Sequence, residues 1–118
     1  MHKIMLLEDD PTMLSLLNTL LEIEGYQVSH TLDFLNTLEA IEQYDPDLIL
    51  LDINLREING LDILKDIRED KHLKDVAVIM SSGMNLKDEC LDTGANDFIL
   101  KPYMPDELVN KIINLLKE

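Results

Sequence analysis

Short apolar runs alternate with longer amphipathic segments along the chain. The runs cover residues 3–7, 26–30, 47–51, 76–80 and 97–100. The first, third and fourth are almost continuously apolar, which is typical of parallel strands that are covered on both faces. The longer segments, residues 11–24, 33–43, 61–69, 86–93 and 106–117, carry apolar residues at helical spacing. This pattern predicts five strands that each lead into a helix.

Local signals support these helix ends. Asp10 is a candidate N-cap for the first helix, with Pro11 at the first helical position and Gly25 at the end. Asn59 followed by Gly60 often forms a hairpin turn, but no alternating strand follows the pair, so we interpret it as a turn that enters the third helix. Five successive βα units predict an open, doubly wound α/β sheet with right-handed crossovers. We expect one domain over residues 1–118.

Composition and charge limit the classes of partner that the protein can bind. The 24 Asp and Glu residues outnumber the 10 Lys and Arg residues and give a formal net charge of -14. Such a surface repels nucleic acid phosphates and anionic membranes, so we expect this domain to bind neither, and basic proteins and divalent cations are favoured instead. The single cysteine, Cys90, cannot form an internal disulfide, which fits a reducing cytoplasm. The N-terminal apolar run is too short for a signal peptide or a membrane span.

Polar residues that can do chemistry follow the predicted strands. They are Glu8, Asp9 and Asp10 after the first strand, Asp52 and Asn54 after the third, Ser81, Ser82 and Gly83 after the fourth, and Lys101 and Pro102 after the fifth. Ligands of doubly wound sheets bind beyond the carboxyl ends of the strands. We therefore expect carboxylates, a hydroxyl and an ammonium group to gather at one edge of the sheet.

Each of these residues also has an ordinary structural interpretation. Glu8 and Asp9 could form a solvated loop whose charge favours the N-terminus of the first helix. Lys101 could be a surface charge. Either serine could supply the hydroxyl, although the glycine that follows Ser82 favours it over Ser81. All these residues follow a predicted strand, and this shared position favours a common functional site.

Four motifs in order resemble the receiver domain of two-component response regulators, of the chemotaxis-receiver type. They are "LLEDD", "PDLILLDINL", "VIMSSG" and "GANDFILKP", and the resemblance covers the whole chain. It implies a five-stranded parallel sheet with the flavodoxin-like strand order 2-1-3-4-5.

The resemblance also implies a phosphoryl acceptor and a metal site. Asp52 would accept the phosphoryl group. Asp9, Asp52 and the backbone carbonyl of Asn54 would hold Mg²⁺, or Mn²⁺ in its place, and Glu8 would assist through a water. Mg²⁺ prefers oxygen ligands and commonly uses one or two carboxylates together with a phosphate.

Four further residues receive roles from the resemblance. Ser82 would hydrogen-bond one phosphoryl oxygen, and Lys101 would neutralise another. Phe98 occupies the position of an aromatic residue that changes rotamer on activation, although simple core packing is an equal alternative. The Lys101–Pro102 peptide bond would be cis.

Some positions depart from the family pattern. Arg56 stands four residues after the acceptor, where many receivers have proline, so we expect a more mobile loop over residues 54–60. Asn54 and Met84 occupy positions that tune the phosphoryl lifetime, and their identities do not fix a rate.

The implied function is a phosphorylation-activated signalling switch, not an enzyme beyond its own phosphorylation and dephosphorylation. A histidine kinase or phosphotransfer protein would be the donor. Phosphorylation would change the binding of a downstream protein, an output domain or a second copy at the face formed by residues 86–93, 97–100 and 106–117. The last helix has a broad apolar arc that fits either such a docking face or deeper burial.

Two rival functions remain. One is an interaction module that signals without phosphorylation, against which the complete acidic, hydroxyl and lysine set argues. The other is a small-molecule phosphatase with an aspartyl-phosphate intermediate, which often needs a second acid where this chain has Asn54.

Overall fold

A parallel sheet forms the middle of the structure, a computed structural model that describes residues 1–117. Its strands lie in the order β2–β1–β3–β6–β7. They are β1 (Lys3–Leu7), β2 (Gln27–His30), β3 (Leu48–Asp52), β6 (Ala77–Ser82) and β7 (Asp97–Leu100). This is the flavodoxin-like order that the sequence predicts, with its reversal between β1 and β3, so the fold prediction is confirmed.

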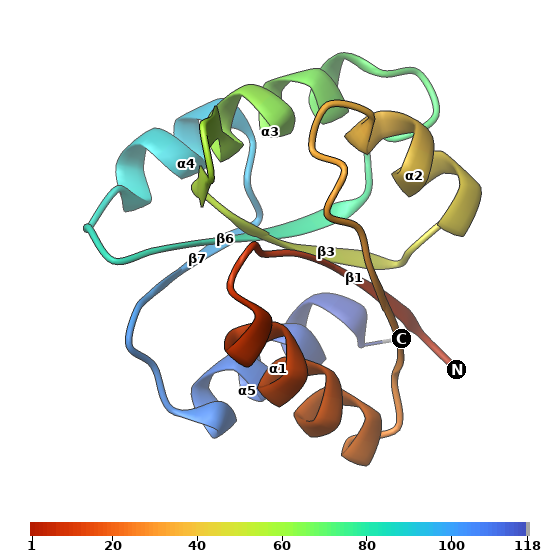
Figure 1. Ribbon diagram of the computed structural model, residues 1–118, viewed down its shortest axis with the longest axis vertical. Coiled ribbons are helices and arrows are strands. Elements are labelled where there is room, and N and C mark those ends of the chain that lie inside the picture. The colour runs from red at the N-terminus through yellow and green to blue at the C-terminus, as the bar shows by residue number, and fades with distance from the viewer. Residues whose placement is uncertain (118) are drawn as a thin grey trace.

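Helices cover both faces of the sheet. Figure 1 shows α2, α3 and α4 on one face and α1 and α5 on the other. They are α1 (Pro11–Ile23), α2 (Thr37–Tyr44), α3 (Gly60–Glu69), α4 (Lys87–Thr93) and α5 (Pro105–Leu116). Asp10 caps α1, because its carboxylate accepts a hydrogen bond from the backbone N–H of Thr12 at 2.9 Å. Within residues 1–117, no helix has the length and apolar character to cross a bilayer.

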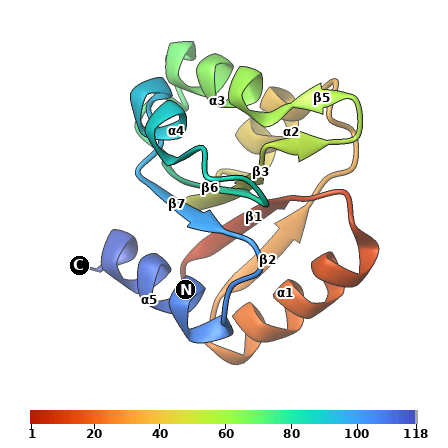
Figure 2. The ribbon, with the colours of Figure 1, turned by 90° about the vertical axis from the view of Figure 1, so that its left-hand side faces the viewer.

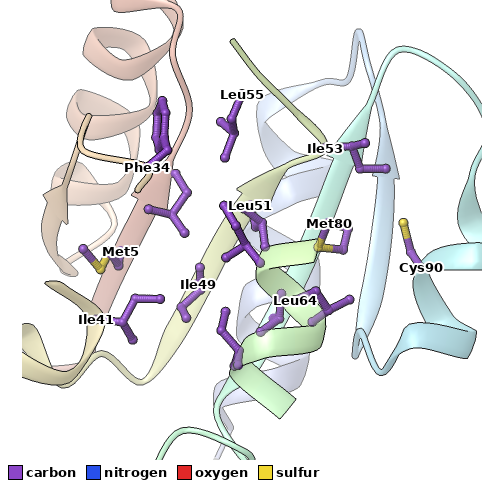
Figure 3. Close-up of a cluster of buried hydrophobic side chains, with 14 of the residues drawn as sticks. Met5, Phe34, Ile41, Ile49, Leu51, Ile53, Leu55, Leu64, Met80 and Cys90 are labelled. Atoms are coloured by element: carbon purple, nitrogen blue, oxygen red, sulfur yellow. The ribbon is translucent and has the colours of Figure 1, made fainter. Parts of the chain in front are cut away.

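Two apolar clusters fill the space between the sheet and its helical layers. Side chains alternate along a strand, so consecutive residues belong to different clusters. The cluster under α2, α3 and α4, shown in Figure 3, takes Met5, Leu7, Ile49, Leu51, Val78 and Met80 from the strands. The cluster over α1 and α5 takes Ile4, Leu6, Leu48, Leu50 and Ile79. The continuous apolar runs are therefore explained by burial on both faces of the sheet.

The second helix begins later than the sequence pattern predicts. We expected it from Asp33, but α2 starts at Thr37. Residues 33–36 form a turn in which the backbone N–H of Asn36 donates to the carbonyl oxygen of Asp33 at 3.2 Å. The turn directs Phe34 into the core, where its side chain is 7% exposed. Tertiary burial of one aromatic ring thus replaces the first turn of the helix.

A short hairpin that the sequence pattern did not predict precedes the third helix. Residues Asn54–Leu55 (β4) pair antiparallel with Ile58–Asn59 (β5), and Figure 2 shows the hairpin on the α3 side of the sheet. The two-residue strands are too short to produce a visible alternation in the sequence. Asn59 still enters α3 as expected, since its side chain accepts the backbone N–H of Leu61 at 2.9 Å. The turn at Arg56 has a positive φ of 57°.

The guanidinium of Arg68 connects three segments on the α3 and α4 side. Its Nε donates to the carbonyl oxygen of Gly94 at 2.8 Å. One terminal nitrogen donates to the carbonyl oxygens of Lys74 at 3.0 Å and Val76 at 2.7 Å. The other donates to Asn96 Oδ1 at 2.9 Å. Arg68 therefore ties the end of α3 to the segment before β6 and to the turn that follows α4.

The apolar arc of α5 is mostly buried. Leu108 and Ile112 are 0% exposed and Val109 is 7% exposed, because they pack against the sheet. Ile113 differs, with 48% of its surface exposed. Deeper burial therefore explains most of the arc, and Ile113 is the exposed part that a partner could contact.

Candidate functional site

The expected residues gather at the carboxyl ends of the strands. Glu8 follows β1 directly, and Lys101 follows β7 directly. Asp52 and Ser82 are the last residues of β3 and β6, whereas we expected both to follow their strands. The sheet pairs Asp52 with Ser81 and thereby fixes the position of Ser82 one residue further along its strand.

The ammonium group of Lys101 bridges two buried carboxylates. Its Nζ lies 2.7 Å from Glu8 Oε1 and 2.9 Å from Asp52 Oδ2. Glu8 is 5% exposed and Asp52 is 6% exposed, so water screens these interactions only weakly. Burial opposes the charge of Lys101, but the hydrogen bonds to Glu8 and Asp52 outweigh it and raise the pKa of Lys101. Lys101 is therefore a cation throughout the neutral range.

Glu8 is a buried acid whose negative charge is only partly balanced. Its Oε2 accepts the backbone N–H groups of Asp9 at 3.1 Å and Asp10 at 3.2 Å. Burial raises the pKa of Glu8, and the nearby charge of Asp52 raises it further, against the opposing effect of Lys101. The single ammonium group of Lys101 is thus shared by Glu8 and Asp52, and a further positive charge at this site would be stabilising.

The donor set suits a hard divalent cation. Glu8, Asp9 and Asp52 each offer one carboxylate oxygen, and these three oxygens lie within 4.8 Å of one another. Three carboxyl groups thus share one nearby ammonium group, that of Lys101. Mg²⁺ takes oxygen ligands and often uses one or two carboxylates. The residues present therefore fit Mg²⁺, and Mn²⁺ prefers similar ligands.

A hairpin contact also touches the acidic cluster. The backbone N–H of Asn54 donates to Asp52 Oδ1 at 3.3 Å, and the backbone N–H of Arg56 donates to Asp9 Oδ2 at 2.9 Å. The Arg56 bond could not be predicted from the sequence, because any residue except proline can donate a backbone N–H. Gly60 was also missed as part of the site. A Cβ atom on Gly60 would overlap the carbonyl oxygen of Asp52.

Ser82 ends its strand at the same edge of the sheet as Asp52, and Phe98 pairs with Met80 on the neighbouring strand. Both follow the strand alternation that places Met80 in the cluster under α4. Ser82 is 1% exposed, and its Oγ accepts the backbone N–H of Met84 at 3.0 Å. Phe98 is 6% exposed and packs in the core.

The segment after β7 completes the site. The Lys101–Pro102 peptide bond is cis, the isomer that the resemblance implies. Tyr103 was not singled out from the sequence. Burial raises the pKa of Tyr103 to about 12. The positive charge of Lys101 acts against this rise, and the charges of Glu8 and Asp52 add to it. Its phenol is therefore neutral at physiological pH.

Comparisons with known proteins agree with this geometry. A family model described as the response regulator receiver domain matches residues 4–113. The transcriptional regulatory protein CpxR of Escherichia coli K12 is 36% identical over 118 residues, which cover 99% of this chain and 50% of CpxR. The chain spans about half the length of the curated relatives it matches.

Two solved structures are similar over nearly their whole length. The receiver domain of the sensor histidine kinase PA1611 from Pseudomonas aeruginosa PAO1, solved with a magnesium ion in its active-site cleft, superposes with a TM-score of 0.87 at 26% identity. This match covers 99% of this chain and 98% of the other. The BeF3-activated receiver domain of RstA from Klebsiella pneumoniae gives a TM-score of 0.89 at 27% identity, with 98% and 99% covered.

Proposed function

This chain belongs to the response regulator receiver family of two-component signalling systems, and from that premise we propose that Asp52 accepts a phosphoryl group from a histidine kinase or phosphotransfer protein. The observation that carries the proposal is the position of Asp52 at the end of β3, with Lys101 Nζ 2.9 Å from Oδ2 and two further acids beside it. The family is a signalling family and not a class of classical enzymes.

The transfer requires a nucleophile and stabilisation of phosphoryl charge. An Asp52 carboxylate oxygen would attack phosphorus of a phosphohistidine, and the P–N bond would break with its electron pair left on the imidazole. Lys101 would stabilise charge on one equatorial oxygen of the transferring group. Ser82 would donate its hydroxyl to another. The transition state of phosphoryl transfer is loose, and its negative charge is spread over the equatorial oxygens. Positively charged groups and hydrogen-bond donors at fixed positions therefore contribute more than a general acid or base.

A divalent cation belongs to this proposal. Asp9, Asp52 and the backbone carbonyl of Asn54 would hold Mg²⁺, or Mn²⁺ in its place, with Glu8 assisting through a water. When bound, the cation supplies charge neutralisation between an anionic donor and an anionic acceptor. Glu8 already accepts two backbone N–H groups and the Lys101 ammonium, which supports an indirect role for it.

Phosphorylation would act on partner binding through the face formed by α4, β7 and α5. An aspartyl phosphate would carry about -1.5 to -2 charges near neutral pH in place of the single charge of the carboxylate, which would draw Ser82 toward Asp52 and keep Lys101 at the site. Ser82 leads directly into the segment before α4, so its movement would bias the face formed by α4, β7 and α5. A complete shift from 1:99 to 99:1 needs about 5.5 kcal/mol of differential stabilisation. Phe98, which packs in the same core cluster as Met80 and Cys90, would adjust its rotamer.

The scope of the proposal is the receiver unit. We propose that residues 1–118 act as one receiver domain in the cytoplasm and that the face of α4, β7 and α5 binds a downstream protein, an output domain or a second copy. Curated relatives such as MtrA of Mycolicibacterium smegmatis are described as DNA-binding response regulators, and 49% of that protein is covered by this chain.

Intact mass spectrometry tests the acceptor and the cation together. The protein is incubated with Mg²⁺ and a small acyl-phosphate donor beside Asp52→Asn and the matched control Asp97→Asn, which changes an acid at the start of β7 outside the cluster. We expect one phosphoryl adduct in the wild type and in the control, none in Asp52→Asn and none without Mg²⁺.

Beryllofluoride covers the case of a short-lived adduct. If the mass shows no adduct, beryllofluoride with Mg²⁺ should still shift the amide resonances of residues 52–56 and 82–86 in an NMR spectrum. Neither an adduct nor a shift would overturn the proposal and favour a module that signals without phosphorylation. Steady turnover of a generic phosphate ester would instead favour a phosphatase.

A further inference from the structure

Two backbone amides of the β4–β5 hairpin hold two carboxylates of the acidic cluster. The N–H of Asn54 donates to Asp52 Oδ1 at 3.3 Å. The N–H of Arg56 donates to Asp9 Oδ2 at 2.9 Å, although the two residues are 47 positions apart in the chain. The Arg56 bond is the shorter of the two, and its acceptor is the more exposed acid, since Asp9 is only partly buried.

The hairpin is itself held firmly. Leu55 is 0% exposed and packs in the core under α2 and α3. At its base, the N–H of Gly60 donates to the carbonyl oxygen of Ile53 at 2.6 Å. At its tip, the guanidinium carbon of Arg56 lies 5.7 Å from the centre of the Phe34 ring, within the range of a cation–π contact. The amide of Arg56 therefore has a fixed position relative to β3.

The conformation of Arg56 serves this contact at a local cost. Its φ of 57° lies in the left-handed region, which L-residues with a side chain adopt at a cost of roughly 1 kcal/mol or more. Within residues 1–117, Asp45 is the other residue besides glycine that has a positive φ. The surrounding contacts must offset this strain, and the hydrogen bond to Asp9 is one of them.

We propose that Arg56 is a positioning residue for the divalent cation, through the backbone N–H that holds the Asp9 carboxylate. This inference rests on the proposed function, because the cation it concerns is the one that supports phosphorylation of Asp52. With Oδ2 bound to the hairpin, the rotamer of Asp9 is restricted and Oδ1 stays available as a ligand. A ligand that is oriented before the cation arrives binds it more tightly, and partners of metal ligands typically change affinity by about 10- to 100-fold.

The role belongs to the backbone of residue 56, and the side chain has a separate function. The guanidinium lies over Phe34 and fastens the hairpin tip to the turn before α2. Glycine at this position would keep the N–H, adopt the positive φ without strain and lose only the ring contact. Proline, the residue that many receivers have at this position, would remove the N–H and fix φ near -65°, so the proposed contact is specific to chains that have another residue here. The two substitutions therefore separate the backbone role from the side-chain role.

The test measures cation affinity directly. Isothermal titration with Mg²⁺, repeated with Mn²⁺, compares the wild type with Arg56→Pro, Arg56→Gly and Arg56→Met. We expect Arg56→Pro to weaken binding by about 10-fold or more, whereas Arg56→Gly and Arg56→Met stay within about threefold of the wild type. Equal affinities for Arg56→Pro and Arg56→Gly would overturn the inference. A wild type that binds neither ion at millimolar concentration would overturn the cation part of the proposed function as well.

A second measurement does not depend on the folding of the proline variant. Hydrogen exchange followed by NMR compares the Arg56 amide in the wild type and in Asp9→Ala, which removes the acceptor. We expect the amide to exchange at least about tenfold faster in Asp9→Ala, since the loss of a hydrogen bond to a carboxylate typically costs about 1.5 kcal/mol or more. An unchanged rate would show that Asp9 does not hold the hairpin in solution and would contradict the inference.

Discussion

Lys101 and Asp52 lie 49 positions apart in the chain, yet the Nζ of one is 2.9 Å from the Oδ2 of the other. The lysine thus already pairs with the carboxylate that we propose as the phosphoryl acceptor. A bound divalent cation must share Asp52 with this ammonium group, and the two positive charges repel each other.

The first prediction concerns that competition. Lys101→Met removes one positive charge and leaves Glu8 and Asp52 to repel each other, so Mg²⁺ should bind more tightly, by about fivefold or more if the relieved repulsion is about 1 kcal/mol. Phosphorylation by an acyl-phosphate donor should nonetheless slow. Calorimetric titration measures the affinity. Lys111→Met, which removes a lysine paired with Asp97 at 3.3 Å, is the control and should leave it unchanged. Unaltered Mg²⁺ affinity in Lys101→Met would contradict the competition.

Gly60 provides a test of packing next to the acceptor strand. A Cβ atom there would overlap the backbone of Asp52 and lie 2.8 Å from the Cα of Ile53, so the chain would have to shift. Gly60→Ala should therefore lower the free energy of unfolding by about 1 to 3 kcal/mol in urea denaturation. Gly83→Ala is the matched control, since an added Cβ meets nothing within 4 Å. Equal stability of the two variants would disagree with the close approach at Gly60.

The third prediction concerns the half-buried guanidinium of Arg68. Arg68→Met would leave the partly buried carbonyl oxygens of Gly94 and Val76 without this donor. We expect a loss of about 1 to 3 kcal/mol in the free energy of unfolding, because acceptors that lose their donor and are only partly reached by water carry a desolvation penalty. Lys65→Met, on the exposed face of the same helix, should change stability by less than about 0.5 kcal/mol. A similar small effect in both variants would rule out a structural role for the Arg68 network.

Cys90 gives a pH prediction. Burial, together with the nearby charge of Glu89, raises the pKa of its thiol from 9.0 to about 11. The folded state therefore holds the thiol proton more tightly than the unfolded chain. The resulting stability is complete below about pH 9 and is lost as the pH rises toward 11. In urea denaturation, Cys90→Ala should lose less free energy of unfolding than the wild type as the pH rises between these values.

Thiol labelling checks the same group independently. Since only the thiolate reacts and Cys90 is 0% exposed, an aromatic disulfide reagent at pH 8 should label the folded protein far more slowly than the protein in urea. Rapid labelling of the folded protein would mean that the thiol is accessible and that the pKa argument does not hold.

Ile113 tests the proposed partner face. It is 48% exposed on α5, so Ile113→Glu should leave stability within about 0.5 kcal/mol of the wild type. If α4, β7 and α5 bind a second copy on activation, sedimentation velocity with beryllofluoride should detect association in the wild type and not in this variant. Ile23→Glu, at the 78% exposed end of α1, is the control. Association that persists in Ile113→Glu would place the interface elsewhere.

Much of the fold could be predicted because burial imposes a strong pattern. The central strands are covered on both faces, so "LILL" before Asp52 has no polar interruption. The position of the acidic cluster then follows from the parallel arrangement of the strands, whose carboxyl ends share an edge. The cap at Asp10 was likewise predictable, because its contacts are local in sequence.

The features that escaped prediction depend on contacts between distant segments. The turn before α2 forms because Phe34 reaches the core, which outweighs the helical preference of its neighbours. The hairpin depends on the burial of Leu55, a single side chain. The contact between Arg56 and Asp9 uses a backbone N–H, which has no signature in a sequence. The family roles of Ser82 and Phe98 remain predictions.

The Arg68 network makes the two ends of α4 mechanically unequal. At its C-terminal end, the Gly94 carbonyl is held by the Arg68 Nε at 2.8 Å. At its N-terminal end, Leu86 provides no side-chain cap and Asn85 Oδ1 accepts the Lys87 N–H at a longer 3.4 Å. The segment from Ser82 to the helix passes through Gly83, where an added Cβ would meet nothing within 4 Å. A displacement of Ser82 would therefore tilt α4 about its C-terminal end, which Arg68 holds. The largest displacement would occur at the N-terminal end of α4, which is nearest the phosphoryl group.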